Sequence, residues 1–208
     1  MATVKIVGLS GSPRKGRNTE YLLNAALEEA SKVEGVKTEL IRLTDYRVLP
    51  CDGCNTCAKE GNCPLDEQDD MVKISEKLKE ADAVIIAAPS YFASVPGIMK
   101  IFMDRSRPLK MKGHLLAGRV VSALSVSGLR NGGGEAVVDE IVRFGLSHGM
   151  IVVGGVGDPL TQASFGIGSL QGDSGWRRTS GDEIALQSTR SVGKRVAEVA
   201  SALKRGIT

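Results

Sequence analysis

The chain has 208 residues, of which 42% are hydrophobic and 25% are charged, and its formal net charge is +3. This length and apolar content suffice for a sizeable core, which excludes wholesale disorder and suits one compact α/β domain over residues 1–208. Because the basic residues are scattered rather than striped, the charge favours neither nucleic acid nor a membrane as the partner.

The first residues carry no secretory signal pattern, because Met1–Gly8 leads directly into a β-branched apolar stretch. No apolar run approaches the ~20 residues that span a bilayer. We therefore expect a soluble, cytoplasmic protein.

Strand and helix patterns alternate along the chain. Short β-branched apolar runs predict strands at 4–9, 36–43, 83–88, 119–126 and 150–154. Apolar residues at helical spacing predict helices at 19–32, 69–81, 96–105, 134–147 and 182–204. Five strands joined by helices, with no hairpin signal, predict a parallel sheet covered on both faces. Right-handed crossovers make a doubly wound open sheet the simplest topology.

One segment, residues 158–181, does not fit this alternation. It is rich in glycine and serine, holds the single tryptophan, Trp176, and has no usable period. Long segments without regular structure are usually functional or disordered. We expect an irregular segment that is either a mobile surface loop, or a lid or subunit contact.

The turn after the first strand has the composition of a phosphate-binding loop. The following helix presents unpaired N–H groups and the positive end of its dipole to this turn. Hydroxyl, amide and basic side chains surround that helix start: Ser10, Ser12, Arg14, Lys15, Arg17, Asn18 and Thr19. Arg17 and Asn18 stand where an NTP-binding P-loop needs Lys and Ser/Thr, and the dinucleotide fingerprint is absent. The turn therefore favours one terminal phosphate, as in FMN, and an ordinary solvated turn is the alternative.

Residues 8–19, GLSGSPRKGRNT, resemble the phosphate loop of the flavodoxin-like NADPH-dependent FMN reductase superfamily. Residues 89–100 resemble that family's P-x-Y-x-x-x-x-x-G-x-x-K stretch, and a glycine-rich stretch comparable to the family's follows the fourth strand. In a 2-1-3-4-5 sheet the first and third strands are neighbours, so their loops border one crevice. The resemblance implies FMN contacts from Ser10, Ser12, Arg14, Asn18, Thr19, Pro89, Ser90, Tyr91, Phe92, Ser127 and Gly128. Plain packing is the alternative role of the two aromatic residues.

All four cysteines lie in one short run, Cys51-x-x-Cys54-x-x-Cys57-x5-Cys63. This run is too compact for most two-knuckle zinc sites, and its successive x-x gaps with Pro64 after the last cysteine are similar to the ferredoxin-type run. Thiolates suit iron–sulfur clusters and zinc alike, so a structural zinc site and disulfides remain alternatives.

A flavodoxin-like FMN domain with such a cysteine loop, at 51–64 after the second strand, resembles the iron–sulfur flavoprotein family of anaerobic prokaryotes. The resemblance implies bound FMN and a [4Fe–4S] cluster on Cys51, Cys54, Cys57 and Cys63. It also implies a homodimer or homotetramer in which flavin and cluster exchange electrons at the subunit interface.

The expected function is electron transfer, in which a ferredoxin-like donor supplies the cluster and reduced FMN serves a small acceptor such as oxygen, peroxide or a quinone. No catalytic triad is discernible; His114 and His148 are predicted as a surface-loop and a helix-end residue, and Glu67, Asp69 and Asp70 as helix-start carboxylates. One alternative is an NAD(P)H-dependent FMN or quinone reductase whose cysteines hold zinc or nothing. Another is a non-enzymatic redox sensor or carrier.

Overall fold

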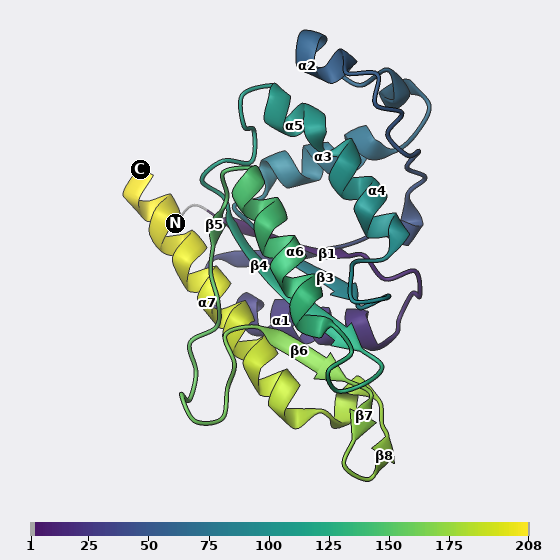
Figure 1. Cartoon of the computed structure of the whole chain (residues 1–208). Coiled ribbons are helices and arrows are strands. Elements are labelled where there is room, and N and C mark those ends of the chain that lie inside the picture. The colour runs from purple at the N-terminus through teal and green to yellow at the C-terminus, as the bar shows by residue number, and fades with distance from the viewer. Residues whose placement is uncertain (1–2, 208) are drawn as a thin grey trace.

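The computed structural model describes residues 3–207, which fold around one parallel sheet (Figure 1). Its strands are β1 (Val4–Ser10), β2 (Val36–Arg42), β3 (Ala83–Pro89), β4 (Val120–Ser127) and β5 (Ile151–Val152). They lie in the order β2-β1-β3-β4-β5, and every neighbouring pair is parallel. The doubly wound α/β sheet predicted from the sequence is confirmed.

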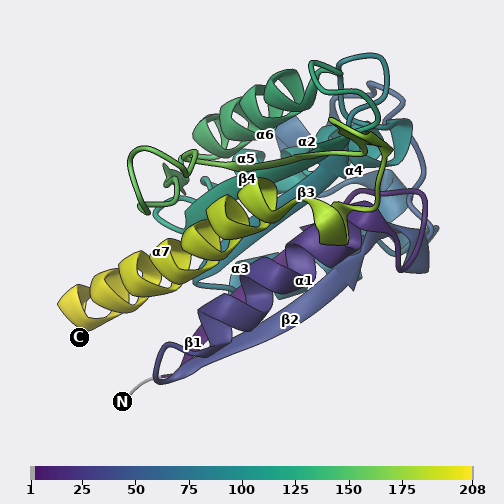
Figure 2. The same cartoon turned by 90° about the horizontal axis from the view of Figure 1, so that it is seen from below.

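Helices cover both faces of this sheet (Figures 1 and 2). One face carries α1 (Asn18–Ser31) and α7 (Glu183–Ile207), and the other carries α3 (Met71–Glu80), α4 (Gly97–Arg105) and α6 (Gly134–Ser147). Two short helices, α2 (Thr56–Glu60) and α5 (Arg107–Met111), and turns η1 (Leu43–Asp45), η2 (Pro64–Glu67) and η3 (Thr179–Gly181) complete the helical elements. Within residues 3–207, no helix combines the length and apolarity that crossing a membrane requires.

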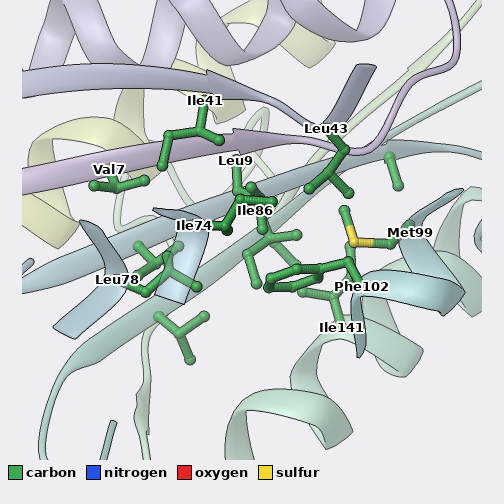
Figure 3. Close-up of a cluster of buried hydrophobic side chains, with 14 of the residues drawn as sticks. Val7, Leu9, Ile41, Leu43, Ile74, Leu78, Ile86, Met99, Phe102 and Ile141 are labelled. Carbon is green, nitrogen blue, oxygen red and sulfur yellow. The ribbon is translucent and has the colours of Figure 1, made fainter. Parts of the chain in front are cut away.

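The strands are apolar on both faces because both faces are buried. In β1, Val7 and Leu9 belong to the core beneath α3, α4 and α6 (Figure 3), whereas Val4 and Ile6 belong to the core beneath α1 and α7. The same alternation divides the residues of β3 between the two cores. This two-sided burial explains why the run from Ala83 has no polar position.

The fifth strand position differs from the prediction. Two short strands pair in parallel with β4 at this position. The first is β5, and the second, after a long connecting loop, is β6 (Gly166–Ser169). A small antiparallel pair follows, β7 (Gln171–Gly172) with β8 (Gly175–Trp176). The segment expected to be irregular therefore contains strands. A Cβ on Gly166 would lie 2.0 Å from Oγ1 of Thr189, so close packing under α7 requires glycine where a strand pattern would show an apolar residue.

Candidate functional site

An open pocket of about 270 Å³ lies at the carboxyl ends of β1, β3 and β4. It is lined by Ser12, Arg14, Arg17, Asn18, Thr19, Pro89, Ser90, Tyr91, Val126, Ser127, Gly128 and Leu170. The structure thus gathers the predicted FMN contacts, except two. Ser10 is buried as the last residue of β1, and Phe92 is fully exposed on the adjoining turn.

The start of α1 leaves hydrogen-bond donors available to this pocket. Arg17 is the N-cap residue of α1, and its side chain caps none of the first-turn N–H groups. Ser12 Oγ stabilises the loop, because it accepts a hydrogen bond from the N–H of Arg14 at 3.2 Å. Among residues 3–207, Arg14 and Arg17 form no ion pair with a carboxylate.

An ion pair between a buried carboxylate and a partly exposed arginine lies behind the loop and fixes its shape. Glu20, whose side chain is 6% exposed, accepts hydrogen bonds from Nε and Nη2 of Arg42 at 2.9 and 2.6 Å and from the N–H of Gly16 at 3.0 Å. Gly16 has a φ of +63°, a conformation that favours glycine. The Arg42 hydrogen bond, followed by that of Gly16, lowers the pKa of Glu20 against the opposing effect of burial. The carboxylate of Glu20 therefore stays ionised, and the guanidinium of Arg42 balances its charge. In this form it orders the loop.

The second loop of the pocket is the one that follows β3, and it contains a strained turn. Tyr91 and Ser94 exchange backbone hydrogen bonds of 2.9 and 3.2 Å across Phe92 and Ala93, whose φ angles are +53° and +58°. Hairpin turns of this shape normally carry Asn or Gly. Glu140 on α6 stabilises the turn, because its carboxylate accepts hydrogen bonds from Ser94 Oγ at 2.9 Å and from the N–H of Val95 at 3.1 Å.

The third loop of the pocket is the one that follows β4, and it connects the pocket to the segment beyond β5. Ser90 Oγ donates to the carbonyl oxygen of Gly132 at 2.5 Å, which connects the second and third loops. The N–H of Leu170 donates to the carbonyl oxygen of Ser127 at 3.0 Å, and the exposed Trp176 ring faces Gly128. Sequence reasoning missed Leu170 because the glycines around it hide the strand before it.

These features fit FMN. The phosphate end is matched by uncapped helix N–H groups, hydroxyl and amide side chains, and two cations without a carboxylate partner. The opposite end offers Tyr91, Val126 and Leu170 as flat or apolar surfaces. Gly128 leaves space there that a side chain would fill against Trp176.

The cysteine segment, residues 51–64, lies outside this pocket and is tightly bent. Gly53, Asn55 and Gly61 all have positive φ angles, between +65° and +76°. Cys51 and Cys54 are exposed, Cys57 is buried, Cys63 is partly exposed, and none is in a disulfide. Burial raises the pKa of the Cys63 thiol.

Both flanks of this segment are held by one arginine. Arg105, at the end of α4, donates to the carbonyl oxygen of Leu49 at 2.9 Å and to the carboxylates of Asp66 and Asp69. The carboxylate of Asp66 in turn accepts a hydrogen bond from the N–H of Cys63 at 3.3 Å, and that of Asp69 accepts one from the N–H of Leu49 at 2.9 Å. The carboxylate of Asp69 accepts a hydrogen bond from the N–H of Met71 at the start of α3, as predicted for a helix-start residue. The full burial of its side chain against Arg105 is not evident from the sequence.

The donor set of this segment fits an iron–sulfur cluster. Its four thiols are free, two of them are accessible, and Nε of Arg105 is a buried donor without a partner among residues 3–207. No three Cys, His, Asp or Glu side chains in the described part of the chain are arranged as a metal site. Cys51, Cys54, Cys57 and Cys63 would hold a cluster only with a local rearrangement of the loop that brings the four thiols together.

Neither histidine lines the pocket or belongs to the cysteine segment. His114 is exposed on a loop, and His148 is buried at the end of α6, where its Nε2 lies 2.9 Å from Ser106 Oγ. Both positions agree with the sequence interpretation. Figure 1 shows α2 of the cysteine segment beyond α3 and α5, away from the β7–β8 pair beside the pocket.

Comparison with known proteins assigns this arrangement to a family. The model of the NADPH-dependent FMN reductase family matches residues 4–159. An iron–sulfur flavoprotein of Archaeoglobus fulgidus is 42% identical over 201 residues, covering 97% of this chain and 98% of that protein. One of Methanocaldococcus jannaschii is 42% identical over 202 residues, covering 97% and 100%. Among solved structures, a flavodoxin, WrbA-like protein from Agrobacterium tumefaciens has a TM-score of 0.62 at 19% identity, covering 96% and 99%, which supports the fold.

Proposed function

The chain belongs to the NADPH-dependent FMN reductase family and, within it, to the iron–sulfur flavoproteins, and from that membership we propose how its two sites work together. The protein is an FMN-dependent oxidoreductase. We propose that it accepts electrons from a ferredoxin-like donor through a [4Fe–4S] cluster on Cys51, Cys54, Cys57 and Cys63, and reduces oxygen, peroxide or a quinone at FMN.

The observation that carries this proposal is the presence of both sites in one chain. A pocket with donors for a phosphate and surfaces for a flat ring lies at the sheet edge, and four free thiols lie in one bent segment. When bound, a cluster supplies single electrons and FMN accepts one or two, so the pair can connect one-electron donors to two-electron acceptors.

The residues of the pocket would hold and orient the flavin rather than exchange protons with it. Arg14, Asn18 and Thr19 are proposed to bind the phosphate, and Ser12 keeps the loop in place. Tyr91, Ser127 and Gly128 are proposed to line the ring. Phe92, fully exposed beside the pocket, is proposed as an FMN contact only through assembly of two chains.

Positive charge beside the cysteine segment supports an acidic donor. Lys59 on α2, Lys110 on α5 and Lys112 directly after it lie around the packed pair of short helices α2 and α5. In the described part of the chain, none of these three lysines forms an ion pair with a carboxylate. Such a surface favours encounter with an acidic protein.

The proposed assembly is a homodimer or homotetramer, because the cysteine segment and the pocket share no lining residue within one chain. A second copy would supply the cluster nearest to each flavin. We propose a cytoplasmic location, where reducing conditions keep the four thiols free.

Anaerobic mixing separates this function from an NAD(P)H-dependent reductase with a structural cysteine site. We expect FMN of the intact protein to be reduced by ferredoxin, and a Cys54→Ser variant to keep FMN but lose that reduction. Fast FMN reduction by NADH or NADPH that survives in Cys54→Ser, with no reduction by ferredoxin in either protein, would overturn the proposal. Redox-dependent partner binding without turnover would instead indicate a sensor.

A further inference from the structure

Arg105 is buried more deeply than an arginine usually is. Its side chain is 1% exposed, and it is among the largest fully buried side chains of residues 3–207. Fully buried charges are rare unless they are paired. Its principal partner, Asp69, has a side chain that is 0% exposed, so this pair carries a cost in desolvation that an ordinary surface ion pair avoids.

The contacts of Arg105 are directed to the cysteine segment. Nη1 contacts Leu49 just before Cys51, and Nη2 donates to Asp66 at 3.0 Å just after Cys63. The other carboxylate oxygen of Asp66 accepts the N–H of Cys63. A single carboxylate therefore lies between the guanidinium and the backbone of a thiol residue.

The partners of Arg105 stabilise its charged form. Burial opposes the charged form, but the hydrogen bond and the charge of Asp69 outweigh it and raise the pKa. Two of its donor nitrogens are committed to the flanks, while Nε is buried without a partner among the described residues. The guanidinium is thus a permanent positive charge behind the cysteine loop.

We propose that Arg105 is a positioning residue of the cluster segment that joins its two flanks and holds a positive charge near Cys63, thereby raising the reduction potential of the bound cluster. The inference rests on the proposed function, since it needs a cluster on these cysteines. Reduction adds one negative charge to a cluster, so a nearby cation stabilises the reduced form, and net charge is one determinant of cluster potential. Asp66 and Asp69 act in the opposite direction.

The test compares cluster potentials of anaerobically purified variants by redox titration followed by EPR. Arg105→Gln removes the charge and is expected to make the one-electron reduction about tenfold less favourable, a shift of about 59 mV to more negative potential. Arg105→Lys keeps the charge and is expected to keep the potential. It loses the two-pronged hydrogen bonding of the guanidinium to Asp66 and Asp69, so we expect a lower iron content per chain. Lys194→Gln, which removes an exposed charge on α7 at the other face of the sheet, is the matched control and is expected to change nothing.

Asp66→Asn keeps the test decisive if Arg105→Gln fails to fold. The Asp66 side chain is 24% exposed, so its replacement is milder, and the loss of a negative charge is expected to shift the potential in the positive direction. A potential that is unchanged in Asp66→Asn, and in Arg105→Gln where it folds, overturns the inference while leaving the proposed function intact. Absence of iron and sulfide from the parent protein overturns the proposed function itself.

Discussion

Arg14 and Lys15 are adjacent cations with different surroundings. Arg14 lines the pocket without a carboxylate partner, whereas Lys15 forms an ion pair with Asp45 outside it. We expect Arg14→Gln to weaken FMN binding about tenfold or more, because a charged hydrogen bond contributes ~1.5–3 kcal/mol. Flavin fluorescence titration of the apoprotein measures this. Lys15→Gln is the control, and equal losses in both variants would contradict the pocket assignment.

His148 gives stability a pH dependence with a defined sign. Burial, followed by the charges of Lys110 and His114, lowers the pKa of His148 from 6.5 to about 4. The unfolded chain therefore binds a proton at higher pH than the folded protein does. The stabilising contribution is complete above about pH 6.5, and it declines as the pH falls and is lost by about pH 4.

We expect the free energy of unfolding to fall by about 2 kcal/mol between about pH 7 and about pH 5 through His148 alone. Urea unfolding at the two pH values should show this decrease in the parent and a smaller one in His148→Gln. His114→Asn, at an exposed left-handed position, removes only the smallest of the three causes of the lowered pKa, so most of the parent's decrease should remain in it. A decrease of the same size in His148→Gln would show that other groups cause it.

At the residue scale, the sequence predicts which side chains surround the pocket but not the ion pairs behind them. Pocket residues follow strands directly, and the ends of adjacent parallel strands meet by geometry. The pairs Glu20–Arg42 and Asp69–Arg105 join residues of different elements. Their partners depend on how those elements pack, and no local pattern reveals that.

At the element scale, α1 and α7 approach through a glycine. A Cβ on Gly193 of α7 would lie 2.1 Å from the carbonyl oxygen of Ala26 on α1. Gly193→Ala therefore forces the helices apart, and we expect a loss of ~1–3 kcal/mol in the free energy of unfolding. Thermal and urea denaturation measure it. Gly206→Ala in the same helix meets nothing within 4 Å and should be neutral or stabilising; a similar loss there would contradict the packing explanation.

Most elements follow from apolar periodicity, and the exception has a physical cause. The prediction places the core strands β1, β3 and β4 and the helices α1, α3, α4 and α6 to within a few residues, because both faces of the sheet are buried, but it misses the short helices α2 and α5. Strand β6, with the sequence Gly-Ile-Gly-Ser, was not. Small residues are needed where α7 crosses close to it, so steric fit replaces the hydrophobic pattern that a strand normally shows.

At the scale of the whole molecule, the lysines around the cysteine segment should govern donor association. We expect ferredoxin-dependent FMN reduction to slow as ionic strength rises, and to slow several-fold in a Lys110→Glu, Lys112→Glu double variant. Stopped-flow rates against ferredoxin concentration measure both effects. Lys194→Glu on α7 carries the same kind of change away from this surface and should retain the parent rate. Equal slowing in that control would contradict docking at α2 and α5.

The account as a whole depends on one chain holding both an FMN and a cluster on its four cysteines. The most direct measurement is the visible spectrum of the anaerobically purified protein together with iron, sulfide, zinc and FMN per chain, in the parent and in Cys54→Ser. We predict flavin bands over a broad iron–sulfur absorbance, [4Fe–4S] stoichiometry and FMN equimolar with the chain, with the iron and sulfide lowered and FMN kept in the variant. Flavin bands alone, with zinc in place of iron, would contradict it.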